Sequence, residues 1–403
     1  MNNSQSRAQP GAPHARAGHA ALPDAPRPTA STKRPSLAFL VSHSSAGGAQ
    51  EIWANLAEAF LDRGYPVQLC ALYPYRAEIR ETAEALPWRY MLPYRPGSPL
   101  GLIRLLTGLA SYLRRERPDF VFSAMPAANV LGPLVGKLVG APTRFVTSHH
   151  SPAQTHSRLI DFADGLTGSF ANVQAVVSVS QAVGDSLAHK PAAYRAKRRT
   201  IHNALPPRIE SRIEVLAQAR MSGRKSFRRL VATGRLARQK NYPMLLKAAV
   251  LLDDVMIDIV GSGPDEAELK AMAVSLGVSE RVLFHGQCSR ERALNILAEG
   301  DVFVQPSLFE GHSLGLIEAA KLGLPLVVSD VPVQLEGITS HDGRRCGLAV
   351  DPHDHEAFAA AVRSLLDDET ERDLWAGRAR ALAASATFDR MVAAYEALMG
   401  PRK

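Results

Sequence analysis

Two glutamates are the residues of this sequence best suited to chemistry. Glu310 precedes a predicted helix and Glu318 lies inside it, with seven residues between them. The start of the helix falls between the two carboxylates, and its backbone N–H groups belong to Ser313, Leu314 and Gly315. A helix N-terminus attracts an anion and carboxylates accept hydrogen bonds from hydroxyls, so this layout suits a nucleotide sugar. The alternative is a surface helix with ordinary glutamates, which the glycines and proline around it argue against.

Two cations follow the predicted first strand of the second half of the chain. Arg235 and Lys240 lie in segment 234–241, with four residues between them. Both cations come from one strand-to-helix turn. The forked guanidinium of Arg235 and the compact ammonium of Lys240 are together suited to bind a single diphosphate. The alternative is a solvated basic loop.

Paired glycines follow the first predicted strand of the chain. Gly47 and Gly48 precede a predicted helix, where bare N–H groups and the helix dipole favour an anion. A tight turn that needs glycine for its backbone angles is the alternative. Neither this segment nor segment 261–264 completes the GxGxxG pattern, so the sequence does not predict an NAD site.

Adjacent histidines end another predicted strand. His149 and His150 belong at the mouth of the first sheet, with His156 nearby in sequence. Adjacent residues on a strand point to opposite faces, and no carboxylate near them in sequence completes a ligand set, so no metal site is expected. We interpret one of the pair as a histidine that hydrogen-bonds ligand hydroxyls; a solvated loop histidine is the alternative.

Short apolar runs alternate with amphipathic stretches through most of the chain, which is typical of βαβ units. The predicted strands of the first series are residues 37–42, 67–71, 120–123, 145–148, 175–179 and 199–202. Those of the second series are residues 229–233, 255–260, 282–284, 302–305 and 326–329. The pattern predicts an α/β protein with two Rossmann-like, doubly wound domains that face each other across a cleft.

The predicted domain boundaries follow from this alternation. Residues 1–36 have no hydrophobic period and are interpreted as a disordered extension. An N-terminal domain is expected over 37–205 and a C-terminal domain over 206–385. The stretch 354–399 is predicted to be helical and to pack across both domains, so that the helix at 386–403 returns to the first.

Composition excludes several classes of protein. The 403 residues are 46% hydrophobic, 21% charged and 6% aromatic, as in a globular protein with large cores. Three scattered cysteines support neither a disulfide framework nor a zinc knuckle, and a cytoplasmic setting is expected. No apolar run is long enough to span a bilayer, and the first 36 residues lack a signal-peptide core.

The formal charge of +8 is unevenly distributed. Residues 190–229 carry net +10, residues 1–36 carry net +4, and the remainder carries −6. The basic belt at 190–229 holds only two aromatic residues, Tyr194 and Phe227, rather than the interleaved aromatics of a single-strand binder, so the sequence does not predict a nucleic-acid partner. Other anionic partners fit this belt.

The motifs together resemble the retaining GT-B glycosyltransferases of family 4 (glycosyl transferases group 1). The resemblance rests on the Arg235-x4-Lys240 and Glu310-x7-Glu318 spacings and on segments 260–264, 282–286 and 298–307. It extends over nearly all of 36–400 and is more specific in the second domain. It implies that the second domain binds a nucleotide-sugar donor, that the first binds the acceptor, and that no further cofactor is needed.

The resemblance also implies residue roles. Arg235 and Lys240 would hold the donor diphosphate, together with the helix N–H groups of Ser313, Leu314 and Gly315. Glu318 would hold the ribose hydroxyls and Glu310 the donor sugar. Gly47 and Gly48 would face the diphosphate from the opposite wall, and His149 or His150 would contact the sugar.

Two positions depart from the family pattern. Gln50 stands where many members carry a glutamate, and His312 replaces a common aromatic residue. These departures bear on donor and acceptor preference. The resemblance implies a hexosyltransferase that retains anomeric configuration by front-face attack of the acceptor hydroxyl. The DxD triplet that usually holds a metal in the other major glycosyltransferase fold is absent.

The expected activity is sugar transfer to a saccharide or lipid-linked acceptor in cell-envelope polysaccharide or glycolipid synthesis. A nucleotide-sugar epimerase and a catalytically silent nucleotide-binding partner are the alternatives. A further hypothesis is peripheral contact with an anionic membrane at its inner face, through the amphipathic segment 102–115 and the basic belt. The alternative is a sheet-covering helix and solvated charge.

Overall fold

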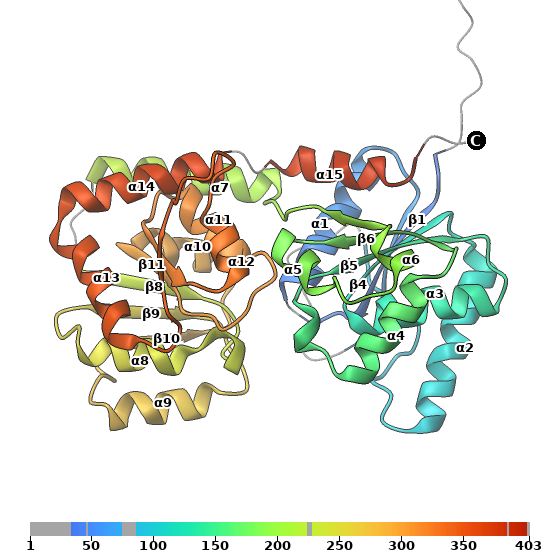
Figure 1. The fold of residues 1–403 in the computed structure, drawn as a ribbon, viewed down its shortest axis with the longest axis horizontal. Helices are drawn as coiled ribbons and strands as arrows, with labels where there is room; N and C mark the ends of the chain where they lie inside the picture. The colour runs from blue at the N-terminus through green and yellow to red at the C-terminus, as the bar shows by residue number, and fades with distance from the viewer. Residues whose placement is uncertain (1–33, 46, 75–85, 224–227, 385–386, 401–403) are drawn as a thin grey trace, which may run out of the picture. The chain divides into compact units, whose positions relative to one another are not determined.

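The computed structural model describes residues 34–45, 47–74, 86–223, 228–384 and 387–400. Residues 1–33 of the predicted extension lie outside this range. The chain from Pro35 onward forms one compact unit, built on two parallel sheets. Both sheets have helices on their two faces, which confirms the predicted α/β class with two Rossmann-like halves (Figure 1).

The first sheet and its covering helices are called the N-lobe. Its strand order is β3-β2-β1-β4-β5-β6-β7 and every pairing is parallel. The strands are β1 (Leu37–His43), β2 (Val67–Tyr73), β3 (Arg89–Tyr90), β4 (Phe120–Ala124), β5 (Arg144–His149), β6 (Val173–Ser178) and β7 (Arg198–Thr200). The helices are α1 (Gly48–Asp62), α2 (Pro99–Glu116), α3 (Pro126–Leu138), α4 (Arg158–Gly168), α5 (Gln181–Ser186) and α6 (Ala192–Arg195), with the 3-10 turn η1 (Ala153–Thr155).

The second sheet and its covering helices are called the C-lobe. Its order is β10-β9-β8-β11-β12-β13, again parallel throughout. The strands are β8 (Arg229–Thr233), β9 (Met256–Val260), β10 (Val282–Gly286), β11 (Val302–Gln305), β12 (Leu326–Ser329) and β13 (Leu348–Val350). The helices are α7 (Pro207–Gly223), α8 (Tyr242–Val250), α9 (Glu266–Ser275), α10 (Arg290–Glu299), α11 (Leu314–Lys321), α12 (Pro332–Gly337), α13 (His355–Asp367) and α14 (Glu369–Ala383), with the 3-10 turn η2 (Arg238–Lys240).

The order of strands reverses direction next to the first strand of each lobe. β1 lies between β2 and β4, and β8 lies between β9 and β11. In such sheets ligands bind outside the carboxyl ends of the strands at this switch point. The turns after β1, β8 and β11 carry Gly47, Arg235 and Glu310, so the topology brings the candidate residues of each lobe to its switch point.

The last helices of the chain pack on both lobes, as the sequence predicts. Phe358 of α13 is buried in the core of the C-lobe. The final helix α15 (Phe388–Ala397) buries Phe388 and Tyr395 in the N-lobe core, against α1. Figure 1 shows α15 beside α1. The strands β3 and β13 are absent from the sequence prediction because these edge strands of two and three residues are too short to show a period.

Candidate active site

The turn after β8 holds Lys240 against the start of the C-lobe sheet. Gly234 has φ +145, and a Cβ there would lie 2.5 Å from Cε of Lys240. A Cβ on Gly261, where φ is +137, would lie 2.0 Å from the carbonyl oxygen of Gly234. The two glycines let adjacent loops and the lysine stem pack closely. The partial glycine motif at 261–264 therefore has a packing role in this lobe.

Arg235 and Lys240 leave this turn in different environments. Lys240 is half-buried, whereas Arg235 is exposed. Within the described ranges Arg235 has no hydrogen bond or ion pair to another side chain. The turn thus offers one cation fixed by the protein and one that faces solvent.

Glu310 is the centre of the polar contacts of the C-lobe. It is 5% exposed, and its Oε1 lies 2.7 Å from Nζ of Lys240. Oε1 also accepts hydrogen bonds from Gln305 Nε2 at 2.8 Å and from Ser307 Oγ at 2.7 Å. Oε2 accepts a hydrogen bond from Gln239 Nε2 at 3.2 Å. Four donors from two segments, the turn after β8 and the end of β11 with the residues that follow it, therefore fix one carboxylate, and Oε2 is the less crowded oxygen.

The start of α11 lies three residues after Glu310. Ser313 caps the helix, and its side chain accepts a hydrogen bond from the N–H of Leu316 at 3.3 Å. Leu314 and Gly315 occupy the first turn, where helical geometry provides no carbonyl partner for the N–H groups. A Cβ on Gly315 would lie 2.2 Å from Oγ1 of Thr233, so glycine lets the helix start reach the end of β8. The candidate anion site and Lys240 thus meet at one switch point.

Glu318 is buried inside α11 and forms an ion pair with Arg290 of α10. Burial raises its pKa to about 7, Arg290 opposes this shift, and Glu51 adds to it. Arg290 also bridges to Glu51 of α1 with 3.0 Å between NH1 and Oε2. A chain of three charged side chains therefore joins the ribose candidate of the C-lobe to the first helix of the N-lobe.

Gly47 and Gly48 begin that first helix. Gly47 is the N-cap of α1, and both glycines are exposed. A Cβ on Gly47 would lie 2.7 Å from Oε1 of Gln50, whereas a Cβ on Gly48 would meet nothing within 4 Å. A side chain at the first position would therefore displace the amide end of Gln50, and the second position leaves open space above the N–H groups.

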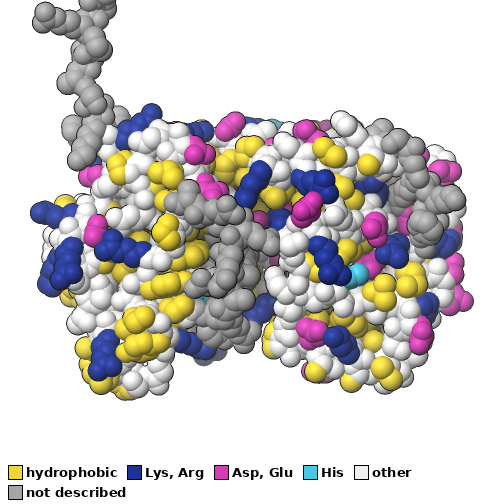
Figure 2. All heavy atoms as spheres, turned by 180° about the vertical axis from the view of Figure 1, so that it is seen from behind, with side chains coloured by type: hydrophobic (Ala, Val, Ile, Leu, Met, Phe, Trp, Pro, Cys, Tyr) yellow, Lys and Arg dark blue, Asp and Glu magenta, His cyan; other side chains and the backbone are white. Residues whose placement is uncertain are grey.

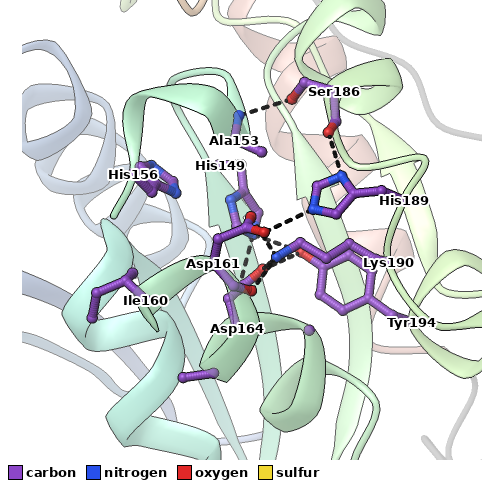
Figure 3. A network of polar contacts seen from close by, with 12 residues as sticks. His149, Ala153, His156, Ile160, Asp161, Asp164, Ser186, His189, Lys190 and Tyr194 are labelled. Carbon is purple, nitrogen blue, oxygen red and sulfur yellow. Dashed lines mark hydrogen bonds and ion pairs between the residues drawn. The ribbon is translucent and has the colours of Figure 1, made fainter. Parts of the chain in front are cut away.

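His149 lies within a buried charged network of the N-lobe (Figure 3). It is 2% exposed, and its Nε2 lies 3.3 Å from Oδ1 of Asp164 and 2.9 Å from the hydroxyl of Tyr194. Lys190 is also buried, and its Nζ lies 2.7 Å from Oδ1 of Asp161 and 3.1 Å from Oδ2 of Asp164. Although burial opposes it, the charges of His149 and Lys190 lower the pKa of Asp164. The fold brings Asp164 of α4 to His149, a contact that no local pattern in the sequence indicates.

This network also fixes the hydrogen-bonding state of His149. Tyr194 donates its hydroxyl hydrogen to Oδ2 of Asp164 at 2.9 Å. Nε2 of His149 therefore carries the hydrogen that it shares with Tyr194 and Asp164. Nδ1 is buried without a hydrogen-bond partner in the part of the chain that the structure describes.

His150 points to the opposite face of β5, as alternation along a strand requires. Its ring meets Trp53 of α1 edge-on, with 5.2 Å between centroids. Burial, helped by the charge of His149, lowers its pKa to about 3, so the ring is neutral at physiological pH. A Cβ on Gly311 would lie 2.0 Å from the carbonyl oxygen of His150. The backbone of the histidine pair in the N-lobe therefore packs closely against the backbone of the Glu310 loop in the C-lobe.

Further polar contacts join the lobes beside this point. Glu336 of α12 accepts hydrogen bonds from the N–H groups of Gln181 and Ala182 at 2.7 and 2.8 Å. It also lies 2.7 Å from Nε2 of His202. The ring of His202 lies over His312, with 5.0 Å between centroids. His312, the residue that departs from the family pattern, therefore takes part in the contact between the lobes.

Two family models match the chain. The model described as Glycosyltransferase Family 4 matches residues 46–208, and the model described as Glycosyl transferases group 1 matches residues 221–382. The first range covers the N-lobe sheet after β1, and the second covers most of the C-lobe. The chain belongs to the GT-B glycosyltransferases of the family 4 type.

Curated and solved glycosyltransferases resemble the chain over most of its length. It is 26% identical to the lipopolysaccharide core biosynthesis glycosyltransferase LpsE of Rhizobium meliloti, over 82% of this chain and 89% of that protein. Anabaena HepE, solved with UDP and glucose, superposes with a TM-score of 0.74 at 19% identity, covering 91% of this chain and all of HepE. Sucrose-phosphate synthase from Thermosynechococcus elongatus superposes with a TM-score of 0.72 at 18% identity, covering 91% of this chain and 98% of that chain. These two solved structures support the GT-B fold.

Several site residues of this glycosyltransferase escape sequence reasoning. Arg290, Gln305 and Ser307 contact the two glutamates, yet none belongs to a recognisable spacing. A serine three residues before Glu310 and a glutamine at the end of a predicted strand were the available signals. Arg290 gave none, because its contact with Glu318 depends on how α10 packs against α11.

The structure also accounts for much of the basic belt of this glycosyltransferase. Many of its cations pair within the chain. The examples are Lys190 with Asp161 and Asp164, Arg198 with Asp185, Arg212 with Glu291, Arg228 with Asp254 and Asp367, and Arg229 with Asp258 and Glu299. The belt therefore presents fewer available charges to a partner than its sequence suggests.

Neither a metal-binding cluster nor a membrane-spanning helix is found among the described residues. No group of three or more His, Cys, Asp and Glu side chains that could hold a metal ion occurs among them. In the same residues, every helix is too short or too polar to cross a bilayer.

Proposed function

We propose that this glycosyltransferase moves a sugar from a nucleotide-diphosphate sugar to a saccharide or lipid-linked acceptor and retains the anomeric configuration. The observation that carries the proposal is the 2.7 Å contact between Lys240 and Glu310 beside the start of α11. A cation and free helix N–H groups suit the diphosphate of such a donor, and the fixed carboxylate beside them suits its sugar.

Departure of the nucleotide diphosphate builds negative charge on the leaving group. Lys240, Arg235 and the N–H groups of Leu314 and Gly315 would receive that charge, and preorganised donors of this kind lower the barrier. Glu310 would accept a hydrogen bond from a sugar hydroxyl through Oε2, the oxygen with a single donor among the described residues. Glu318 would accept hydrogen bonds from the ribose.

His149 suits a role at the sugar because Nδ1 has no protein partner in the described chain and would exchange a hydrogen bond with a sugar hydroxyl. His150 is neutral and packs on Trp53. We therefore assign the sugar contact to His149. His149→Ala would then raise the KM for donor more than His150→Ala at equal thermal stability.

Retention is tested on the product. Proton NMR of the new glycosidic linkage, compared with the anomeric configuration of the donor, should give the same configuration. An inverted linkage would refute the mechanism while leaving the fold untouched. Conversion of the donor sugar with no acceptor present would instead indicate an epimerase.

The donor is found by a thermal-shift panel of nucleotides and nucleotide sugars, because a ligand that binds only the folded state raises the melting temperature. UDP and its sugars come first, since HepE is solved with UDP. The Lys240→Ala variant should lose the shift of the best ligand. A protein that binds the donor but never turns it over would fit a silent binding partner.

The relatives favour a role in cell-envelope polysaccharide or glycolipid synthesis, as LpsE acts in lipopolysaccharide core biosynthesis. We further propose a metal-independent reaction in the cytoplasm. Transfer should be unchanged in excess EDTA. Loss of activity in EDTA with recovery on adding Mg²⁺ or Mn²⁺ would contradict this part.

Peripheral membrane contact is the remaining part of the proposal. At the start of α2, Leu100, Leu102 and Ile103 are between 46% and 56% exposed, and Arg104 is exposed beside them. Figure 2 shows apolar and basic side chains gathered at the lower end of the N-lobe, where α2 lies. Apolar side chains beside cations suit an anionic bilayer surface. Flotation with vesicles containing anionic lipid, but not with neutral vesicles, is expected, and Ile103→Asp should abolish it.

A further inference from the structure

A large groove runs beside the proposed donor site. Its volume is about 1220 Å³, larger than the pockets of about 300–1,000 Å³ that hold most drug-sized ligands. Its N-lobe wall consists of Pro152, Gln154, Thr155, Gln181, Ala182, Asp185 and Ser186. Its C-lobe wall consists of Arg238, Leu308, Phe309, Val331, Pro332, Val333 and Glu336. None of the residues assigned above to the donor lines it.

The groove nevertheless adjoins the reaction site from both lobes. Leu308 and Phe309 directly precede Glu310, and the N–H of Leu308 donates to the carbonyl of Gln239 at 2.8 Å. On the other wall, Pro152 follows the histidine pair by two residues. A molecule in the groove would therefore have one end near the carboxylate and the histidines, as an acceptor hydroxyl requires.

The two walls differ in chemistry. The C-lobe wall is mainly apolar, and Leu308 and Phe309 are only half-buried. The N-lobe wall presents the exposed side chains of Gln154 and Thr155. Apolar surface on one side and amide and hydroxyl groups on the other fit a saccharide, whose rings have C–H faces and hydroxyl edges.

The charges along the groove identify the ligand further. Asp185 lies 3.8 Å from Arg198 and accepts a hydrogen bond from Gln181 Nε2 at 2.9 Å. Glu336 is occupied by His202 and by two backbone N–H groups. Arg238 is exposed and, among described residues, has no carboxylate within ion-pair distance. The acids of the groove are neutralised and its arginine is not, so the groove offers a positive charge to its ligand.

We propose that this groove binds the acceptor, and that the acceptor is an oligosaccharide with a phosphate or carboxylate group that Arg238 contacts. This inference rests on the proposed transferase function. A guanidinium can form two parallel hydrogen bonds with either group. Arg238 is thus a specificity-determining residue that the C-lobe contributes to acceptor binding.

The test uses the full chain, the radiolabelled donor identified by thermal shift, and a saccharide extract of the source cells. Anion exchange divides the extract into a neutral and an anionic pool. Label should enter the anionic pool, and Arg238→Ala should lower kcat/KM with that pool about 10- to 100-fold, the range expected for a charge-assisted hydrogen bond. Arg238→Lys should recover part of the loss, and Arg238→Glu should lose more.

Lys247→Ala is the matched control, because it removes an exposed cation from α8 outside the groove. It should leave kcat/KM unchanged. Donor-induced melting shifts should be equal in the wild type and in every Arg238 variant. Phosphatase treatment of the anionic pool separates the two groups, since loss of acceptor activity indicates phosphate and retention indicates carboxylate.

Two results would overturn the proposal: label entering the neutral pool alone, or equal transfer by the wild type and Arg238→Ala. Failure of the proposed function gives a different pattern, in which neither pool accepts label although the donor binds. That pattern would refute both, whereas the first two results refute only the acceptor assignment.

Discussion

The two lobes use ionisable side chains in opposite ways. In the C-lobe, Lys240 and Glu310 meet at the end of the sheet, beside a helix start with free N–H groups. In the N-lobe, Lys190, Asp161 and Asp164 neutralise one another behind the sheet end and enclose His149. Desolvation makes buried charge expensive, so a lobe that retains such a cluster uses it to fix structure. Under the proposed function, charge therefore serves ligand binding in the C-lobe, whereas in the N-lobe it places one histidine.

The largest expected effect concerns the buried N-lobe cluster of Lys190, Asp161 and Asp164. Lys190→Met leaves Asp161 and Asp164 without their cation, and we expect the free energy of unfolding to fall by about 3–5 kcal/mol. Urea denaturation measures the loss. Asp185→Ala is the control in the same lobe; its side chain is 65% exposed and its pair with Arg198 should contribute under about 1 kcal/mol. A loss below about 1 kcal/mol for Lys190→Met would contradict the structural role.

The loss from Lys190→Met should also depend on pH. The pKa of Asp164 is lowered in the folded protein, so its contribution to stability is present above the unfolded pKa, near 3.8, and is lost as the pH falls through the lower folded value. The difference in free energy of unfolding between Lys190→Met and the wild type should therefore become smaller in strong acid. A constant difference down to that range would indicate lost packing rather than lost charge.

The next test concerns the charge of the C-lobe. Lys240→Ala removes the cation that faces the diphosphate, and kcat should fall about 10²- to 10³-fold, as when one preorganised donor to a leaving group is lost. Steady-state kinetics with saturating donor measures it. Lys247→Ala, on the adjacent helix, should retain full activity, and a loss of less than threefold in Lys240→Ala would remove the lysine from the mechanism.

Gly311 of the C-lobe lies against His150 of the N-lobe, where the two lobes meet. A Cβ on Gly311 would lie 2.0 Å from the carbonyl of His150, so Gly311→Ala must push the Glu310 loop and the histidine pair apart. A misplacement of about 1 Å can cost up to 10²-fold, and we expect kcat to fall about 10- to 100-fold. Gly377→Ala is the control because its Cβ would meet nothing within 4 Å. Equal kcat for both variants would show that this contact is unimportant.

The smallest expected effect is the pH dependence of nucleotide binding. Burial raises the pKa of Glu318 to about 7, so below that pH the carboxylate that would accept the ribose hydroxyls becomes protonated. Affinity for the nucleotide should weaken as the pH falls from 8 to 6, by at most about tenfold per pH unit, and Glu318→Gln should abolish the dependence. Calorimetric titration measures both. The same raised pKa makes Glu318 stabilise the fold below pH 4.5 and lose that contribution as the pH rises to 7.

Sequence reasoning reached the C-lobe site better than the N-lobe site. Its candidate residues lie on a turn (Arg235, Lys240 and Glu310) or in the helix after it (Glu318), so their spacing is fixed locally by one strand and the helix that follows it. The surroundings of His149 depend instead on contacts between elements far apart in sequence. Asp164 comes from α4, and Lys190 and Tyr194 follow α5. No local period encodes such a meeting, so the neighbours of His149 appear only in the folded chain.

The strand pattern was predictable for a related reason. β8, β11 and β12 are buried apolar runs whose bounds match the prediction. The edge strands β3 of the N-lobe and β13 of the C-lobe are too short for any run to appear. Arg290 escaped prediction because its role depends on the packing of α10 against both α11 and α1.

The closing helix α15 ties the end of the polypeptide to its beginning. Phe388 and Tyr395 complete the core formed by β1 and α1, and Glu396 pairs with Arg63 at 2.7 Å. During synthesis on the ribosome, the first lobe must therefore wait for nearly the last residues to emerge before its interior is closed. The lobe made second can finish folding first, and a nascent chain that stalls before α15 leaves the N-lobe open to chaperones and proteases.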